Sequence, residues 1–223
     1  MSSRPGNEKQ PTPGIYARLI KRPLDVLFSV VLIVILSPLM LLTWLAVRLV
    51  LGAPALFRDE RAGLGGRPFL LAKFRSMSLA TDASGTLLPD AERLRPFGKF
   101  LRRTSLDEFP QLFNVLAGRM SLVGPRPLPM RYVERYDARQ ATRLLVRPGL
   151  TGWAQIHGRN AVAWPERLEY DAEYVEMMSR PGALATDCWI VLVTAFQIVW
   201  QALTGRGVSA PGEATMQEFI REG

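Results

Sequence analysis

The stretch that decides the fold is residues 26–47, which read VLFSVVLIVILSPLMLLTWLAV. These 22 residues contain no charged side chain. At roughly 1.5 Å of rise per residue, a helix of this length just crosses a hydrocarbon core about 30 Å thick. A removed signal peptide fits less well, because the run starts late and lacks a small-residue cleavage site before the next polar stretch. The segment therefore predicts a protein held in a membrane.

Ser37-Pro38 lies near the middle of this segment. Proline removes one helical hydrogen bond and clashes with the preceding turn, so a kink is expected. Two arrangements are open: a kinked helix that spans the membrane, or a re-entrant hairpin whose halves of about a dozen residues dip in and return. Basic residues favour the cytoplasmic side and flank both ends of the segment, which indicates that both ends are cytoplasmic. They are Arg18, Lys21 and Arg22 before it, and Arg48, Arg58, Arg61 and Arg67 after it.

A second apolar stretch, residues 183–203, has two unlike faces. Helical spacing collects its polar residues on one face: Asp187, Thr194, Gln197, Gln201 and, just beyond it, Thr204. The opposite face carries Ile190, Val191, Val193, Phe196, Val199 and Trp200. Such a helix either lies in a membrane interface or packs its apolar face on the protein core.

Composition narrows the possible chemistry. The 223 residues suffice for one full core, and 28 basic against 20 acidic residues give a charge of +8, which indicates anionic partners. With one cysteine, Cys188, and one histidine, His157, neither a disulfide framework, a zinc site nor a histidine-activated nucleophile is expected. Acid, base and nucleophile roles then fall to Asp, Glu, Lys or Tyr.

The middle of the chain predicts short elements. Apolar triplets on either side of three glycines, between Leu56 and Met77, predict a β-hairpin whose glycines form the turn. Residues 79–90 predict an exposed loop, and helical character resumes from about Ala91. Residues 124–127 and 148–152, rich in Gly and Pro, predict turns, and a helical stretch follows the first.

Residues 101–112, LRRTSLDEFPQL, form the densest polar cluster. One interpretation is structural, because Ser105 followed three residues later by Glu108 fits a helix capping box and Asp107 suits a helix start. Another is chemical, because adjacent carboxylates can separate in pKa and give one ionised nucleophile or base and one proton carrier.

Phosphate chemistry is the other possibility that this cluster raises. Asp107 and Glu108 could hold Mg²⁺, which prefers oxygen ligands and bridges to phosphates. Arg102 and Arg103 could meet a diphosphate, and Arg126 between two prolines offers a rigid fork for phosphate. An isolated arginine is more often a solvated surface group, so only convergence in space would support this interpretation.

Six segments in order resemble the monotopic bacterial phosphoglycosyl transferases, the polyprenyl-phosphate sugar phosphotransferases that begin glycoconjugate assembly. They are KRPLD (21–25), SP (37–38), KFRSM (73–77), SLDEFPQL (105–112), SLVGPRP (121–127) and RPGLTG (147–152). The similarity extends from about Lys21 to Gly205. The chain lacks the multi-span N-terminal region of larger relatives and is expected to be a minimal catalytic unit.

The resemblance implies a mostly α fold with a small β-hairpin, a re-entrant helix broken at Ser37-Pro38, and amphipathic interfacial helices around a compact cytosolic body. The expected organisation is a loose leader at 1–13, the re-entrant membrane helix at 14–52, the catalytic domain at 53–204 and a C-terminal tail at 205–223. The expected location is the bacterial inner membrane, with the catalytic domain on the cytoplasmic face.

The resemblance also implies a two-step reaction. Asp107 attacks the β-phosphate of a UDP-sugar and releases UMP, and undecaprenyl phosphate then attacks the phosphosugar on the aspartate. Lys73, Arg75, Arg102 and Arg126 are expected to bind the phosphates and the nucleotide. Mg²⁺ is the expected cofactor, held by Asp107 and Glu108, and Glu108 is the acid, base or metal partner.

The donor sugar is suggested by residues 212–219, GEATMQEF, which look like the tail of small family members acting on UDP-N,N′-diacetylbacillosamine. Membrane lipids are expected partners and nucleic acid is not. Two other functions are a membrane-tethered, Mg²⁺-dependent nucleotide-sugar diphosphatase and a basic membrane-bound protein that binds nucleic acid or acidic lipids. The second leaves the carboxylate cluster unexplained.

Overall fold

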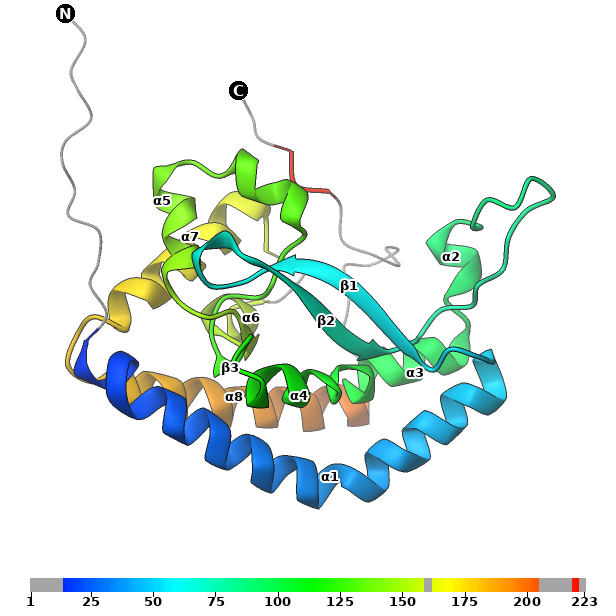
Figure 1. Cartoon of the computed structure of the whole chain (residues 1–223), viewed down its shortest axis with the longest axis horizontal. Coiled ribbons are helices and arrows are strands. Elements are labelled where there is room, and N and C mark those ends of the chain that lie inside the picture. Colours follow the sequence, from blue (N-terminus) through cyan, green and yellow to red (C-terminus); the bar gives the residue numbers. More distant parts are fainter. Residues whose placement is uncertain (1–13, 159–161, 205–217, 221–223) are drawn as a thin grey trace, which may run out of the picture.

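The computed structural model of the chain describes residues 14–158, 162–204 and 218–220. The predicted leader at 1–13 lies outside the described residues, as does most of the predicted tail at 205–223. Helices dominate the described part, and a β-hairpin lies among them, as the sequence predicts (Figure 1).

The long apolar segment forms helix α1, Lys21–Leu51, directly after a short π-helix, Tyr16–Ile20. The predicted break at Ser37-Pro38 is wrong in one respect, because α1 is continuous and Pro38 lies inside it. The predicted kink is confirmed, because the helix bends near its middle, as the missing proline hydrogen bond requires (Figure 1). Ser37 Oγ donates to the carbonyl of Val34 at 2.8 Å, within the same turn.

The N-terminal end of α1 is tied to the rest of the protein by its charged residues. Lys21 forms an ion pair with Asp187, and Arg22 Nη1 donates to the carbonyl of Val115 at 2.7 Å. Asp25, which is buried, accepts a hydrogen bond from the backbone N–H of Leu122 at 3.0 Å. The KRPLD segment thus anchors the apolar helix to the body.

The predicted hairpin is confirmed as β1, Leu56–Ala62, paired antiparallel with β2, Pro68–Phe74. Their register runs from Leu56 opposite Phe74 to Ala62 opposite Pro68. Gly65 and Gly66 in the turn have φ of 67° and 73°, a conformation that glycine adopts without steric cost.

A second, parallel pair joins β3, Ser121–Val123, to β4, Gly149–Thr151. The sequence predicts only a turn at 148–152, so this strand corrects the prediction. Its glycines are required by close backbone approach, because a Cβ on Gly149 would lie 2.1 Å from the backbone nitrogen of Gly124. The Gly-Pro-rich segments after β3 and before β4 therefore lie backbone to backbone.

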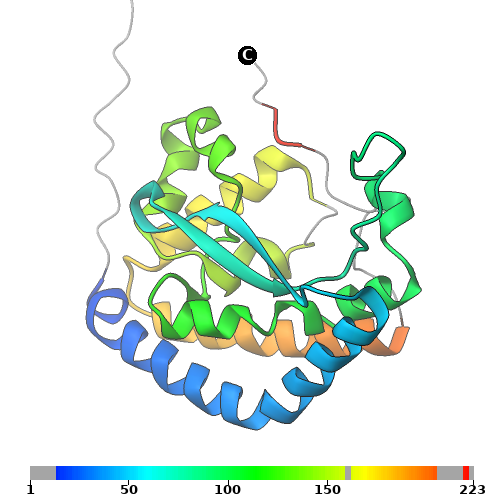
Figure 2. The same ribbon diagram turned by 45° about the vertical axis from the view of Figure 1, so that its right-hand side comes forward.

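Shorter helices connect these elements and lie around the hairpin (Figure 2). In chain order they are α2 (Asp90–Arg93), α3 (Pro96–Arg103), α4 (Gln111–Leu116), α5 (Ala138–Ala141), α6 (Trp153–Ile156) and α7 (Trp164–Met177). Short 3₁₀ helices occur at Leu64–Gly66, Leu106–Glu108, Met130–Arg135 and Thr142–Leu145.

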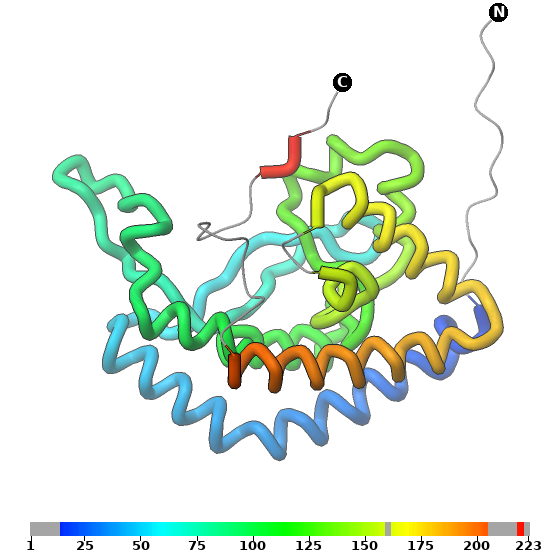
Figure 3. Tube along the Cα trace, turned by 180° about the vertical axis from the view of Figure 1, so that it is seen from behind, coloured from blue at the N-terminus to red at the C-terminus, as the bar shows by residue number. Residues whose placement is uncertain are grey.

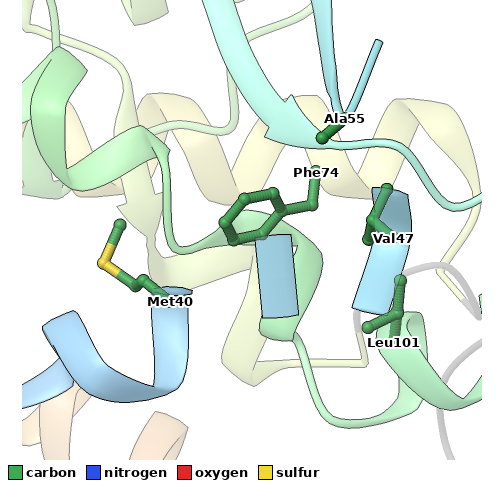
Figure 4. Close-up of a cluster of buried hydrophobic side chains, with 5 residues drawn as sticks. All are labelled: Met40, Val47, Ala55, Phe74 and Leu101. Carbon is green, nitrogen blue, oxygen red and sulfur yellow. The ribbon is translucent and has the colours of Figure 1, made fainter. Parts of the chain in front are cut away.

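A buried cluster fastens the second half of α1 to the catalytic part of the chain (Figure 4). It consists of Met40 and Val47 from α1, Ala55 before β1, Phe74 at the end of β2 and Leu101 from α3. Burying the four larger side chains of this cluster contributes about 1.5–3 kcal/mol each. The cluster fixes the last residue of β2 and the last turn of α3 against the apolar helix.

Helix α8, Ala183–Thr204, runs along the same side of the body as α1 (Figure 3). Its polar face points inward: Asp187 and Gln201 are buried, Thr194 bonds Thr151 at 2.6 Å, and Gln197 donates to the carbonyl of Ile156. Apart from Ile190, the large residues of its apolar face lie outside, with Phe196 68% exposed. Packing of that face on the core is therefore wrong.

This side of the protein is apolar well beyond α8. Helices α1, with its preceding turn, and α8 are both long and apolar enough to cross a membrane by length and composition. Only 17% of the apolar window of each is buried within the protein. Exposed Phe100, Phe113 and Leu116 of α3 and α4 add to the apolar surface. A continuous set of exposed apolar side chains on two long helices is typical of a lipid-facing surface.

Candidate active site

Asp107 and Glu108 lie in a single 3₁₀ turn, Leu106–Glu108, between α3 and α4. Ser105 precedes it in the left-handed region, with φ 56° and ψ 17°. Among the described residues it is the one non-glycine residue with positive φ, a backbone strain often found at functional sites. Its side chain makes no capping hydrogen bond, so the capping-box interpretation is wrong.

The Glu108 side chain lies between two cations instead. Its Oε1 accepts hydrogen bonds from Lys73 Nζ at 2.9 Å and from Arg126 Nη2 at 2.8 Å. Burial opposes the charged form, but the Arg126 and Lys73 charges prevail and hold the pKa of Glu108 well below its usual range. Glu108 is thus ionised near neutral pH, which makes it a poor proton carrier.

Asp107 is in a different electrostatic position. It is 6% exposed, and burial raises its pKa to about 6, with Glu108 reinforcing the rise and Lys73, Arg102 and Arg126 opposing it. The predicted separation of the two carboxylate pKa values is therefore present. Near neutral pH Asp107 is therefore largely ionised yet little solvated, as suits a nucleophile.

Arg102 is held beside the carboxylates by the last turn of α3. Its Nε donates to Ser76 Oγ at 3.0 Å, which fixes the guanidinium against the segment after β2. Burial lowers the pKa of Arg102, and the charges of Asp107 and Glu108 act against that fall. The structure thus brings together Lys73, Arg102 and Arg126, as predicted.

Arg75 is the predicted phosphate ligand that the structure does not bring to the carboxylates. It is 5% exposed, and its guanidinium donates to the backbone carbonyls of Leu51, Gly52 and Ala53. Strand β2 ends at Phe74, so the chain turns and Arg75 no longer shares the direction of Lys73. Arg75 satisfies the carbonyl end of α1, where a cation is favoured.

A buried network behind Arg126 was missed from the sequence. Arg143 Nη2 donates to the backbone carbonyl of Arg126 at 2.6 Å and to Asp171 Oδ2 at 2.8 Å, and its Nη1 donates to Tyr136 at 2.9 Å. Both members of the Arg143–Asp171 pair are at most 4% exposed. The pair joins residues 28 apart on different helices, so no local motif reveals it. It fixes the backbone that carries Arg126.

The residues present fit a Mg²⁺ ion that is bound jointly by protein carboxylates and by the phosphate oxygens of a substrate. Within residues 14–158, 162–204 and 218–220 there is no group of three or more Asp, Glu, His or Cys side chains that could hold a metal. Mg²⁺ needs only one or two carboxylates when phosphate oxygens and water complete its shell. Asp107 and the second carboxylate oxygen of Glu108 are suitable donors, because Oε1 already accepts from two cations.

A groove of about 410 Å³ opens on the side of the apolar helix α1, close to this turn in the chain. Pro110 and Phe113, just after the carboxylates, line one part, and Met40, Leu41 and Trp44 of α1 line another. The remaining lining residues are Leu56, Arg58, Ala72 and Phe74 of the hairpin. An apolar cavity thus lies between the bent helix and the strand that carries Lys73.

Comparison with known proteins gives the family. The model of the bacterial sugar transferase family matches residues 16–201, from the turn before α1 to the last turns of α8. The chain belongs to the bacterial sugar transferase family. This confirms the membership, and with it the phosphoglycosyl transferase enzyme class, that the sequence predicts.

Curated relatives in this family are similar over most of the chain. An uncharacterized sugar transferase of Bacillus subtilis, EpsL, is 42% identical, with 92% of this chain and 98% of that protein covered. UDP-glucose:undecaprenyl-phosphate glucose-1-phosphate transferases of Caulobacter vibrioides and Xanthomonas campestris are each 40% identical. The match covers 87% of this chain and 74% of the first, but 79% of this chain and only 38% of the second.

Proposed function

We propose that the chain transfers a phosphosugar from a UDP-sugar to undecaprenyl phosphate, giving a polyprenyl-diphosphate-linked sugar and UMP. This is the first membrane step in building a glycoconjugate. The observation that carries the proposal is Asp107, a buried carboxylate ionised near neutral pH and influenced by the charges of Lys73, Arg102 and Arg126. Relatives that act on a UDP-sugar and undecaprenyl phosphate support it.

In the first step a carboxylate oxygen of Asp107 attacks the β-phosphorus of the donor. An Asp107–phosphorus bond forms, the bond from the β-phosphorus to the bridging oxygen breaks, and UMP leaves with that electron pair. The poor solvation of Asp107 and its ionisation near neutral pH both support this role. The cations on either side of Glu108 lie where charge builds up on the phosphates.

In the second step an oxygen of undecaprenyl phosphate attacks the same phosphorus. The bond to Asp107 breaks, which restores the carboxylate and releases the lipid-linked diphosphosugar. Division into two steps lets a soluble donor and a lipid acceptor use one site in turn. The apolar groove lined by Pro110 and Phe113 supports a lipid acceptor, because it offers the isoprenoid chain an apolar surface a few residues along the chain from Asp107.

Glu108 acts in this scheme through the cations that it holds. Its charge balances Lys73 and Arg126 in the absence of substrate and keeps both side chains oriented. The low pKa of Glu108 favours this positioning role over proton transfer. Bound Mg²⁺ would offset negative charge on the diphosphate, with Asp107 and Glu108 as its protein ligands.

For the membrane arrangement we favour the re-entrant helix. The bend of α1 supports it, and so do polar anchors at both ends: Lys21 and Arg22 at the start, and Arg75 at the carbonyl end (Figure 1). A helix whose two ends bind the same body returns to the side from which it entered. The basic residues around both ends favour the cytoplasmic face of the bacterial inner membrane.

Two donors are candidates for the sugar. The similarity of residues 212–219 to small family members favours UDP-N,N′-diacetylbacillosamine, and residues 212–217 lie outside the described part of the chain. The names of the Caulobacter and Xanthomonas relatives favour UDP-glucose.

A donor screen that measures UMP release tests the reaction and the sugar together. The full chain in lipid nanodiscs, with Mg²⁺ and undecaprenyl phosphate, should release UMP from one donor and form one lipid-linked product per UMP. Release of sugar phosphate into water, equally fast with and without lipid, would instead show a diphosphatase.

A further inference from the structure

A small cavity lies on the opposite face of β2 from the apolar groove, because Leu71 and Lys73 line the cavity whereas Ala72 and Phe74 line the groove. Its volume is about 40 Å³, which exceeds the roughly 10–15 Å³ that one water needs. Its lining is Arg61, Leu71, Lys73, Gln111, Arg126 and Pro127. Three of these six side chains are cationic, and none is acidic.

Gln111 is the unusual member of this lining. It begins α4, is 2% exposed, and its amide nitrogen has no hydrogen-bond partner among the described residues. A buried donor without a partner destabilises a protein, so such groups are rare unless a ligand satisfies them. Because Gln111 lines the cavity together with three cations, an anion is the partner that best fits its unpaired amide.

Arg61 also has a donor directed at no described acceptor. Its Nη2 pairs with Asp59 and its Nη1 lies 3.5 Å from the carbonyl of Pro127, whereas its Nε is buried and unpaired among the described residues. Lys73 and Arg126 share a single oxygen of Glu108. The cavity therefore has more positive charge and more donors than Asp59 and Glu108 balance.

We propose that Gln111 and Arg61, together with Lys73 and Arg126, form a phosphate-binding subsite in this cavity. All four side chains donate hydrogen bonds through nitrogen. Three of them are cations that repel one another, and Gln111 adds a donor without adding a fourth positive charge. The inference rests on the proposed transfer reaction, in which the phosphate belongs either to the departing nucleotide or to the lipid acceptor. Gln111 and Arg61 are then binding residues for that group.

The test compares wild type with Gln111→Met, which keeps the side-chain volume and removes the amide. In the full chain in nanodiscs, inorganic phosphate should raise the melting temperature of wild type and raise that of Gln111→Met much less. The ligand-free melting temperature of Gln111→Met should equal or exceed that of wild type, because an unpaired buried amide is lost. Equal phosphate stabilisation of both proteins would overturn the subsite.

Two kinetic measurements assign the phosphate. About tenfold or more weaker UMP binding by Gln111→Met would assign the subsite to the nucleotide, the loss expected for one hydrogen bond to a charged group. An equal rise in KM for undecaprenyl phosphate, with UMP binding unchanged, would assign it to the lipid. No change in either would overturn the role in transfer.

Gln197→Met on α8 is the matched control, because it removes a half-buried glutamine amide remote from the cavity lining. It should leave phosphate stabilisation, UMP binding and lipid KM unchanged. A wild type that binds phosphate at this subsite yet never releases UMP from a nucleotide sugar would contradict the proposed function while leaving the subsite intact.

Discussion

Glu108 Oε1 lies 2.8 Å from Nη2 of Arg126, in an ion pair beside the turn that carries Asp107. Because this pair and the one with Lys73 keep Glu108 ionised, the two neighbouring carboxylates have different tasks. Asp107 is the group whose protonation changes near neutral pH, and Glu108 is the fixed negative charge that orients cations. The pH dependence of the first half-reaction should therefore follow the ionisation of Asp107 and not that of Glu108.

The first test is the pH dependence of UMP release in the first half-reaction. Burial raises the pKa of Asp107 to about 6, and only its ionised form can attack phosphorus. The burst rate should therefore fall about tenfold per pH unit below pH 6 and level off above it. A rate that stays constant down to pH 4.5, with the protein still folded, would contradict this assignment.

Removing Lys73 should move that acid limb. Its charge favours the ionised form of Asp107, so Lys73→Met should raise the pKa of Asp107 and shift the limb to higher pH. Lys99→Met, at an exposed position of α3, is the control and should leave the limb in place. The position of the limb is read independently of any loss in maximal rate.

Removing Glu108 should shift the pKa of Asp107 in the opposite direction from removing Lys73. Its charge raises the pKa of Asp107, so Glu108→Gln should shift the acid limb to lower pH while lowering the rate by disturbing Lys73 and Arg126. Glu108 itself should contribute no limb to the pH profile, because its pKa lies well below its usual range. An upward shift of the limb in Glu108→Gln would show that the two carboxylates are wrongly distinguished.

The buried pair behind Arg126 should matter for stability as well as activity. Asp171→Asn leaves the Arg143 charge buried without its partner, which typically costs about 3–5 kcal/mol. Glu169→Gln, which removes an exposed pair with Arg139, should cost about 1 kcal/mol or less. Thermal unfolding in detergent measures both, and equal losses in the two variants would refute the importance of burial here.

Cysteine labelling tests the re-entrant arrangement. Leu19 before α1 and Leu49 near its end are both exposed, so each can be replaced by cysteine in a Cys188→Ser background. In oriented vesicles both positions should react with an impermeant maleimide from the cytoplasmic side only. Labelling of one of them from the opposite side would establish a spanning helix.

The sequence predicts most of what depends on local pattern. The hairpin follows from glycines between apolar triplets, and the apolar segment from its length. The polar face of α8 was also predicted, but its direction was not, because spacing alone cannot say which face meets lipid. The kink at Pro38 was predicted as well, whereas the full break that the family resemblance implied is absent, because α1 continues through Pro38.

The parts that the sequence did not predict depend on contacts between distant residues. Three-residue strands such as β3 and β4 have no visible periodicity, and their pairing joins Ser121 to Gly149. Arg75 lies two residues from Lys73 yet points to the end of α1. The buried donor of Gln111 becomes informative only when its cavity is seen.

The most direct test of the central claim is to mix the full chain with the correct UDP-sugar and Mg²⁺ in the absence of lipid, and to measure the intact mass. Wild type should release one UMP per chain and gain the mass of one phosphosugar, whereas Asp107→Asn should do neither. Asp137→Asn, which keeps a helix cap, should behave like wild type. Full turnover by Asp107→Asn, or an adduct on another residue, would contradict Asp107 as the nucleophile.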